Sequence, residues 1–183
     1  MPHVVIIGDG PAGLSAALFL AKNGMDVTVF GMDKTDVHRA MLYNYLGIPE
    51  ITGSEFQRIA RAQVEKFGAR IETVQVTGVE QSADGFVVAT EDGSRHAGKY
   101  AILAEGKKPR LAEAMGLPRT VNGVEVDCAG RTGVDGLYVV GRSASIGRSQ
   151  AIISAGQGAQ AAVDILSREA GRDVRDYDTV SDD

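Results

Sequence analysis

The sequence contains one cysteine, Cys128, and this scarcity excludes several kinds of redox and metal chemistry. A single thiol cannot form an intramolecular disulfide, a CxxC redox centre or a cysteine-based zinc site. No other metal-ligand spacing is visible, so no metal site is expected. Cys128 itself is either a reactive thiol or an ordinary exposed or half-buried cysteine, and no flanking histidine or lysine favours its thiolate form.

Long apolar runs and an excess of positive charge are also absent. No run reaches the roughly 18 residues that a membrane span needs, and the first residues lack the basic and apolar pattern of a secretory signal. We therefore expect a cytoplasmic protein with no membrane segment. The formal net charge of −5 predicts no nucleic-acid partner. A length of 183 residues suits one well-packed domain better than two.

The stretch VVIIGDGPAG, residues 4–13, joins an apolar strand to a glycine-rich turn and a helix. Gly8 permits the tight turn, Gly10 lets the backbone approach a pyrophosphate, and Gly13 lets the helix pack closely on the strand. The helix, expected over residues 12–23, directs its N-terminal N–H groups and its positive dipole end at the phosphates. A second strand, expected over 26–30, completes a βαβ unit. This context favours a dinucleotide site over a glycine turn without a ligand.

Two acidic residues qualify this prediction. Asp9 places a carboxylate beside the expected phosphate site, so its side chain must point away from the phosphates. Asp33 follows the second strand two residues later than the acidic residue that binds the ribose in many dinucleotide sites. Asp33 either binds the ribose or is a solvated loop residue.

The remaining pattern predicts a mixed α/β chain. Residues 35–52 have no clear period and look like a loop packed over another part of the protein. A helix is expected to begin with a capping box, with Ser54 as N-cap and Gln57 at the third position, and to end near Gly68. Further strands are expected at residues 70–76, 79–81, 85–90, 95–97, 99–104 and 136–141. Other expected features are a surface connection over 107–123, a helix over 149–170 that ends at Gly171, and a disordered charged tail over 172–183.

Several ordered motifs resemble the FAD domain of the thioredoxin reductase-like flavoproteins, the class II pyridine nucleotide-disulfide oxidoreductases. The resemblance covers nearly all of residues 3–170. It rests on the glycine turn and on these further segments: Phe30-Gly31-Met32-Asp33-Lys34, Tyr43-Asn44-Tyr45-Leu46-Gly47, Val74-Gln75-Val76, Ala104-Glu105-Gly106, Arg131 to Tyr138, Gly141-Arg142, Gln150-Ala151 and Ser154-Ala155-Gly156.

This resemblance implies a Rossmann-like three-layer α/β fold with a central parallel sheet, a small antiparallel β-meander and FAD as cofactor. In the family the asparagine at position 44 sits at the flavin, and the strand at Val76 covers the adenine. The cofactor-binding residues that it implies are Gly8, Asp9, Gly10, Pro11, Ala12, Gly13, Gly31, Asp33, Asn44, Val76, Ala104, Glu105, Gly106, Gly141, Arg142, Gln150 and Ala151.

Two parts of the family pattern are missing from this sequence. The family inserts a whole NAD(P)H-binding domain, usually with a CxxC pair, after the strand that ends at Ala104. Here the interval has shrunk to about residues 107–124, with no second glycine fingerprint. The resemblance therefore implies a single FAD-binding domain over 1–171, an external electron donor (reduced nicotinamide or a partner protein), and a flavin face left open for a homo-oligomer or partner.

Two substitutions fall on the cofactor site. Arg142 replaces the family aspartate that binds the ribityl chain, and Glu105 replaces a threonine. One hypothesis pairs Glu105 with Arg142 beside the cofactor, and Arg142 is also placed to meet the pyrophosphate. The alternative is that both side chains are independent and face solvent.

No catalytic residue is assigned from the sequence. His38 is either a proton-transfer group near the flavin or a structural histidine. The leading functional interpretation is an FAD-dependent oxidoreductase that receives electrons from outside the chain. The alternatives are a non-catalytic FAD or nucleotide-binding module, and a relic domain that binds no cofactor.

Overall fold

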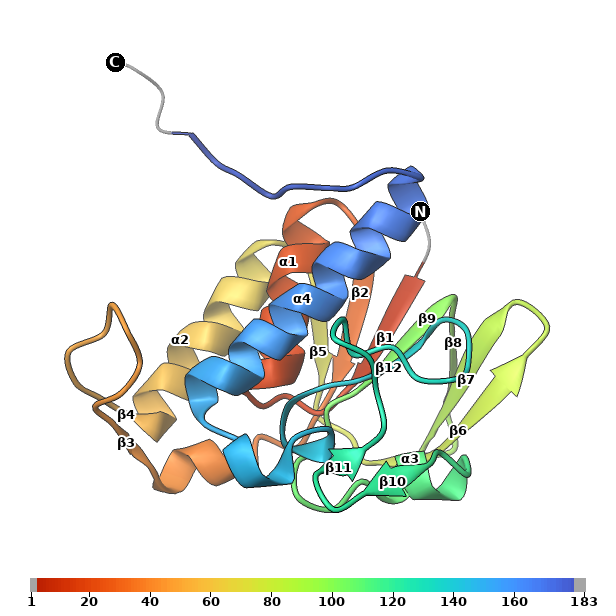
Figure 1. Ribbon diagram of the computed structural model, residues 1–183, viewed down its shortest axis with the longest axis horizontal. Coiled ribbons are helices and arrows are strands. Elements are labelled where there is room, and N and C mark those ends of the chain that lie inside the picture. The colour runs from red at the N-terminus through yellow and green to blue at the C-terminus, as the bar shows by residue number, and fades with distance from the viewer. Residues whose placement is uncertain (1–2, 180–183) are drawn as a thin grey trace.

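The computed structural model describes residues 3–179 and is built around a five-stranded parallel sheet (Figure 1). The strand order is β12-β9-β1-β2-β5, and each neighbouring pair is parallel. The strands are β1 (His3–Ile7), β2 (Asp26–Phe30), β5 (Arg70–Glu72), β9 (Tyr100–Leu103) and β12 (Leu137–Val139). Because both faces of the sheet are covered, its central strands are continuous apolar runs rather than alternating ones.

Alternate side chains of β1 enter two separate cores. Val4 and Ile6 pack against the helices α1 (Pro11–Lys22), α2 (Gly53–Lys66) and α4 (Ala151–Ala170). Val5 and Ile7 face the other core, which includes Phe86 and Val88 of an antiparallel meander. That meander consists of β6 (Val76–Ser82), β7 (Gly85–Thr90) and β8 (Arg95–Gly98). Figure 1 shows the helices and the meander on opposite sides of the sheet. The predicted three-layer fold is confirmed.

Helices α1 and α4 pack with almost no space between their backbones. A Cβ atom added at Gly158 would lie 2.0 Å from the carbonyl oxygen of Ala12, so only glycine permits this approach. The contact fixes α4 against the first turn of α1, beside the glycine turn. At its other end α4 stops at Gly171 with φ of 63°, the left-handed C-terminal residue that the sequence predicts.

The start of α2 differs from the predicted capping box. Its N-cap is Thr52, whose side chain accepts a hydrogen bond from the Glu55 backbone N–H at 3.2 Å. Ser54 contacts His38 instead. Gln57 is buried and donates to the carbonyl oxygen of Asp9 at 2.6 Å. The helix begins earlier than predicted because a buried carbonyl recruits the Gln57 amide, and Thr52 is free to cap.

The chain between β5 and β6 also differs from the prediction. Residues 70–76 were expected to form one strand, but β5 ends at Glu72 in the parallel sheet and β6 begins at Val76 in the meander. The change of sheet between them accounts for the break, since each segment pairs with a different neighbour. The expected strand at 79–81 is the middle of β6.

The two irregular stretches contain short elements. Residues 35–52 hold a 3₁₀ turn η1 (Asp36–Arg39) and the antiparallel pair β3 (Met41–Leu42) and β4 (Ile51–Thr52). Residues 107–124 hold α3 (Arg110–Ala114) and the antiparallel pair β10 (Arg119–Thr120) and β11 (Gly123–Val124). The second stretch is not only a surface connection, because Ala112, Leu117 and Val124 are buried in the core on the meander side. Two further 3₁₀ turns, η2 (Gly141–Ser143) and η3 (Ile146–Arg148), precede α4.

The predicted tail, residues 172–183, is partly fixed where the structure describes it. Lys22 at the end of α1 forms ion pairs with Asp176 at 2.8 Å and with Asp178 at 2.5 Å. The Val174 N–H donates to Ser167 of α4 at 3.0 Å. The last four residues of the predicted tail lie outside the described residues. Across residues 3–179, none of the helices has the length and apolar character needed to cross a membrane.

The α1–α4 contact predicts opposite effects for two glycines of α4. Gly158→Ala should destabilise the protein by about 1–3 kcal/mol, because the new methyl group collides with backbone rather than with a movable side chain. Gly156→Ala is the matched control, since nothing lies within 4 Å of its added Cβ. The control should be neutral or stabilise by about 0.5–1 kcal/mol through helix propensity. Urea unfolding measures both, and equal effects would contradict the packing described here.

A buried tyrosine where β12 meets α4 predicts a loss of stability in alkali. Tyr138 is fully buried and donates to Asp164 at 2.7 Å, and Asp164 also accepts from Arg131 Nε at 2.7 Å. Burial, and then the Asp164 carboxylate, raise the pKa of Tyr138 to about 12. The folded pKa lies above the roughly 10 of an unfolded tyrosine, so this contribution is complete below about pH 10 and is lost as the pH rises toward 12.

Urea unfolding at several pH values should therefore show stability falling by about 1–3 kcal/mol between these limits. Tyr138→Phe should be less stable near neutral pH and should show a shallower alkaline decline. If Tyr138→Phe loses stability with rising pH as steeply as the wild type, the alkaline loss comes from other titrating groups.

Candidate functional site

A cavity of about 730 Å³ opens at the carboxyl ends of the parallel strands. Ligands of open α/β sheets bind at this edge, and the volume falls within the roughly 300–1,000 Å³ of small-molecule sites. The lining includes most of the predicted cofactor-binding residues: Gly8, Asp9, Gly10, Pro11, Ala12, Gly31, Val76, Ala104, Glu105, Gly106, Gly141, Arg142, Gln150 and Ala151. The remaining three, Gly13, Asp33 and Asn44, are not among the lining residues.

The glycine turn has the geometry that its sequence predicts. Gly8 has φ of 110°, and a Cβ there would lie 2.2 Å from the carbonyl oxygen of Ala104. A Cβ at Gly13 would lie 1.9 Å from the Gly8 carbonyl oxygen, so Gly13 allows the close packing of helix on strand without itself reaching the cavity. A Cβ at Gly10 would meet only the Thr35 side chain, at 3.7 Å. Gly10 therefore keeps the turn open toward the cavity.

The first turn of α1 is available to an anion. Gly10 is its N-cap and provides no side-chain hydrogen bond, and Pro11 takes the first helical position. The following backbone N–H groups have no capping acceptor, and the positive end of the helix dipole adds to them. This is the arrangement in which helix N-termini bind phosphate groups.

Asp9 points away from this turn, as the sequence analysis required. Its side chain is buried and forms an ion pair with Arg61 of α2. The same carboxylate accepts the Asp33 backbone N–H at 2.9 Å. Gly31 makes room for it, because a Cβ there would lie 2.2 Å from Asp9 Cγ. The Asp9 charge is therefore balanced by the Arg61 guanidinium and the Asp33 N–H group.

The Asp33 carboxylate is not placed as a ribose ligand. Its Oδ1 lies 3.0 Å from His38 Nε2, within hydrogen-bonding distance. The Asp33 backbone has φ of 51°. His38 also contacts Ser54 at 3.1 Å and lies outside the cavity lining. The Asp33 backbone is tied to Asp9 and its side chain is turned to His38, so ribose binding by Asp33 stays a prediction that these contacts do not favour. The contacts of His38 are those of a structural histidine.

Asn44 and Gln150 are brought together from distant parts of the chain. The Asn44 side-chain amide donates to Gln150 Oε1 at 3.1 Å, across a separation of 106 residues. Gln150 lines the cavity and Asn44 supports it from outside. The asparagine that the resemblance places at the flavin therefore meets a second predicted cofactor-binding residue at one edge of the cavity.

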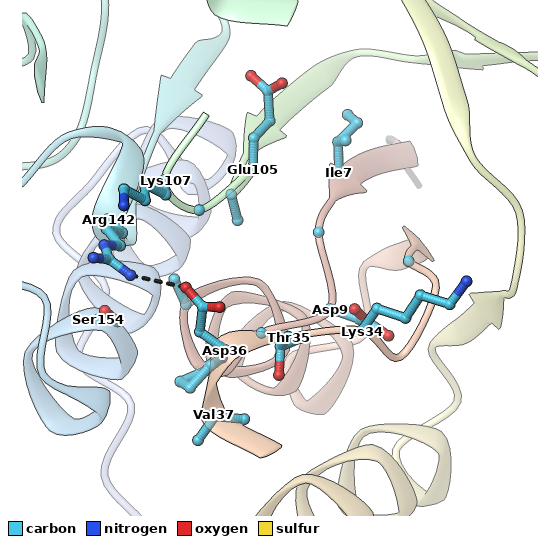
Figure 2. A pocket seen from close by; sticks show the side chains of 18 of the residues that line it. Ile7, Asp9, Lys34, Thr35, Asp36, Val37, Glu105, Lys107, Arg142 and Ser154 are labelled. Atoms are coloured by element: carbon cyan, nitrogen blue, oxygen red, sulfur yellow. Dashed lines mark hydrogen bonds and ion pairs between the residues drawn. The ribbon is translucent and has the colours of Figure 1, made fainter. Parts of the chain in front are cut away.

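The hypothesis that Glu105 pairs with Arg142 is wrong. Glu105 accepts the backbone N–H groups of Leu111 at 2.8 Å and Ala112 at 3.1 Å, so it caps α3. Burial raises the pKa of Glu105, and these two hydrogen bonds oppose the shift. Arg142 Nη1 instead donates to Asp36 of η1 at 2.8 Å. Figure 2 shows Glu105 directed away from this ion pair.

Other lining residues were not singled out from the sequence. Asp36 and Thr35 lie in a stretch without periodicity, and Lys107 lies in the segment for which the sequence predicts a surface connection. The Thr35 hydroxyl oxygen and Arg142 Nε are buried and have no hydrogen-bond partner in the described structure. The only sequence signal for Lys107 was its place directly after the Ala104-Glu105-Gly106 motif.

The lining fits a dinucleotide such as FAD. Apolar side chains lie in two separate segments, Val74 and Val76 leading into β6, and Val37 and Leu42 around η1 and β3. In Figure 1 these segments lie on either side of the glycine turn, toward the meander and toward α2. The free N–H groups of α1 lie between them, with Lys34, Lys107 and Arg142 among the lining cations. The arrangement provides two apolar surfaces for ring systems and a central site for a diphosphate.

The Asp9–Arg61 pair predicts a stability effect confined to one arginine of α2. Arg61→Ala should cost about 3–5 kcal/mol, because it leaves a buried carboxylate without its partner. Arg58→Ala is the matched control one turn earlier on α2; Arg58 is 67% exposed and pairs with Glu55. Its loss should stay within about 1 kcal/mol. Thermal or urea unfolding compares the variants, and similar losses would show that Asp9 does not depend on Arg61.

Solved structures with a similar fold include thioredoxin reductases. That from Gloeobacter violaceus superposes with a TM-score of 0.85 at 19% identity, covering 98% of this chain and 98% of the other. The atypical thioredoxin reductase from Desulfovibrio vulgaris Hildenborough gives 0.81 at 21% identity, covering 93% of this chain and 99% of the other. At these identities the match establishes the fold.

Relatives found by sequence have higher identity to this chain than these structures do, and they are longer proteins. Thioredoxin reductase from Aquifex aeolicus is 33% identical over 117 residues, which cover 62% of this chain and 36% of that protein. The bifunctional thioredoxin reductase/thioredoxin from Mycobacterium leprae is 31% identical over 177 residues, covering 92% of this chain and 36% of that protein. The chain thus spans a little over a third of the length of these relatives.

A family model described as pyridine nucleotide-disulphide oxidoreductase matches residues 2–51 and 46–163, most of the chain. Members of this family and the thioredoxin reductases above are FAD-binding flavoproteins, which confirms FAD as the expected type of cofactor. By fold and by sequence, the chain belongs to the pyridine nucleotide-disulphide oxidoreductase family, on its thioredoxin reductase-like side.

Proposed function

We propose that this chain is the FAD-binding unit of a thioredoxin reductase-like oxidoreductase. The observation that carries the proposal is the cavity at the glycine turn, where open N–H groups of α1 lie between two apolar segments. When bound, FAD supplies the redox chemistry, which is a property of its isoalloxazine ring. The part of the protein is to bind the dinucleotide and to orient its flavin.

The residues divide this task by position. The first turn of α1 binds the diphosphate, with Gly10 leaving room for close approach. Val76, at the start of β6, contacts the adenine. Gln150, held by Asn44, lies toward the flavin end with Ala151 at the start of α4. No side chain is assigned a proton-transfer step.

We further propose that electrons reach the flavin from outside the chain, from reduced nicotinamide or from a partner protein. Support comes from the interval between β9 and β12, where α3 and the β10–β11 pair stand in place of an inserted NAD(P)H domain. Cys128 is exposed and is the one cysteine of the sequence, so it has no intrachain partner for a dithiol. A single domain over residues 1–171, a homo-oligomer and a cytoplasmic location remain predictions.

A second candidate is a non-catalytic FAD-binding module that serves as a sensor, carrier or subunit. Two specific contacts favour it. Glu105 is committed to capping α3, and Arg142 is paired with Asp36. Position 142 therefore lacks the aspartate with which the family binds the ribityl chain, and the side chain at position 105 is engaged elsewhere. A domain of this kind could retain the cofactor without turning it over.

Purification and an anaerobic titration distinguish these functions. We expect a yellow protein with flavin absorbance that bleaches on adding NADH, NADPH or a reduced partner protein. A yellow protein inert to all of these donors would favour the binding module. A colourless protein that takes up no added FAD would contradict both candidates and indicate a relic domain.

A substitution in the glycine turn, Gly10→Val, tests where the cofactor binds. Gly10 has φ of −77°, which other residues adopt, and its added side chain points into open space beside Thr35. The variant should fold, as thermal unfolding can check, but should lose FAD affinity by at least about tenfold, because the side chain occupies the approach to the diphosphate. Unchanged FAD affinity would mean that the cofactor does not lie at the turn.

A further inference from the structure

The ion pair of Arg142 and Asp36 lies directly over the first turn of α1. Gly141 packs against that turn so closely that an added Cβ would lie 2.8 Å from Ala12 Cβ. Arg142, the next residue, therefore starts from a backbone position fixed beside the expected phosphate site. Figure 2 shows its guanidinium reaching across the cavity to Asp36 of η1.

Two nitrogens of this guanidinium, Nε and Nη2, have no hydrogen-bond partner in the described structure. Asp36 accepts from Nη1, whereas Nε is buried and makes no hydrogen bond within the described structure. An unmet buried donor is unfavourable, and a charged one more so. The Asp36 contact holds one end of the planar group, while the Arg142 side chain stays 33% exposed and Nη2, which pairs with no acceptor in the described structure, remains a donor for an anion at this wall of the cavity.

A second cation faces the same region. Figure 2 shows the Lys107 side chain pointing toward Arg142, and both residues line the cavity. Among residues 3–179 no carboxylate forms an ion pair with Lys107, and Glu105 is turned to the backbone of α3. Two cations and one carboxylate, Asp36, thus remain at this wall. Like charges that converge on a cavity are favourable when an anion lies between them.

We propose that Arg142, Lys107 and Asp36 form an anion subsite that binds the diphosphate of the dinucleotide opposite the first turn of α1. Arg142 is the ligand-binding residue, Lys107 adds positive charge, and Asp36 is a positioning residue that holds the guanidinium. A guanidinium only donates, and it binds an anionic acceptor such as phosphate more strongly than a neutral hydroxyl or carbonyl oxygen. The two phosphates are the only anionic groups of FAD. This inference rests on the proposed binding of FAD but adds a specificity that the family motif does not carry.

Isothermal titration with ADP and adenosine tests the subsite without any flavin chemistry. ADP carries the diphosphate and adenosine does not. Arg142→Ala should weaken ADP binding by about tenfold or more, leave adenosine binding unchanged, and make the affinity for ADP less sensitive to salt. Arg58→Ala, an exposed arginine of α2 outside the cavity lining, should leave both affinities unchanged.

Two substitutions of Asp36 separate positioning from charge. Asp36→Asn keeps an acceptor for Nη1 but removes the carboxylate that competes with phosphate, so it should bind ADP several-fold more tightly than the wild type. Asp36→Ala removes the acceptor as well and should bind ADP more weakly than Asp36→Asn. Equal affinities of Asp36→Asn and Asp36→Ala for ADP would show that Asp36 does not position the Arg142 guanidinium.

The outcomes also separate this inference from the proposed function. If Arg142→Ala binds ADP as the wild type does, or loses adenosine to the same degree, the subsite is wrong even when the protein still takes up FAD. If the wild type binds neither ADP nor FAD, the proposed function fails together with the subsite. Thermal unfolding of each variant confirms that the compared proteins are folded.

Discussion

Contact between backbones around the first turn of α1 is the constraint on which the rest of the structure depends. Gly8 lies against the end of β9, Gly141 lies against Ala12, and Gly158 of α4 lies against the Ala12 carbonyl. Segments from the beginning, middle and end of the chain therefore meet at one helical turn. Because each contact excludes even a methyl group, the cavity wall is positioned by main chain, which has few ways to relax.

Side-chain ties add a second level of order to the same site. Asp9 and Arg61 connect the glycine turn to α2, and Asn44 and Gln150 connect the segment before α2 to the start of α4. Both contacts use charged or amide side chains. They join elements that are not paired as strands, so they fix parts of the cavity edge that the parallel sheet does not hold.

The fold was predictable because its signals are local. Strand β1, the glycine turn and the end of α4 at Gly171 follow from apolar runs and from residues with special backbone freedom. The side-chain pairs between residues far apart in the sequence were less predictable. Arg61 carries no signal of its pairing with Asp9, from which it is 52 residues distant.

The errors have the same origin. Arg142 and Glu105 were placed in one region correctly but were joined wrongly, because α3 supplies Glu105 with backbone donors that the sequence pattern did not show. The N-cap of α2 moved to Thr52 because Gln57 met a buried carbonyl instead of its own helix end. In each case a tertiary contact competed with a local motif and replaced it.

The pairing of β12 with β9 has a consequence for how this architecture changes. The two strands are parallel neighbours, with Leu137 beside Ala101, so the chain leaves the sheet at the carboxyl end of β9 and crosses back to enter the adjacent strand at its amino end. The intervening segment is a crossover between two strands that the sheet holds at a fixed separation, and lengthening such a connection adds little entropic penalty. The strand pairing of the sheet therefore tolerates connections of very different length between β9 and β12, and the short segment with α3 and the β10–β11 pair is one of them.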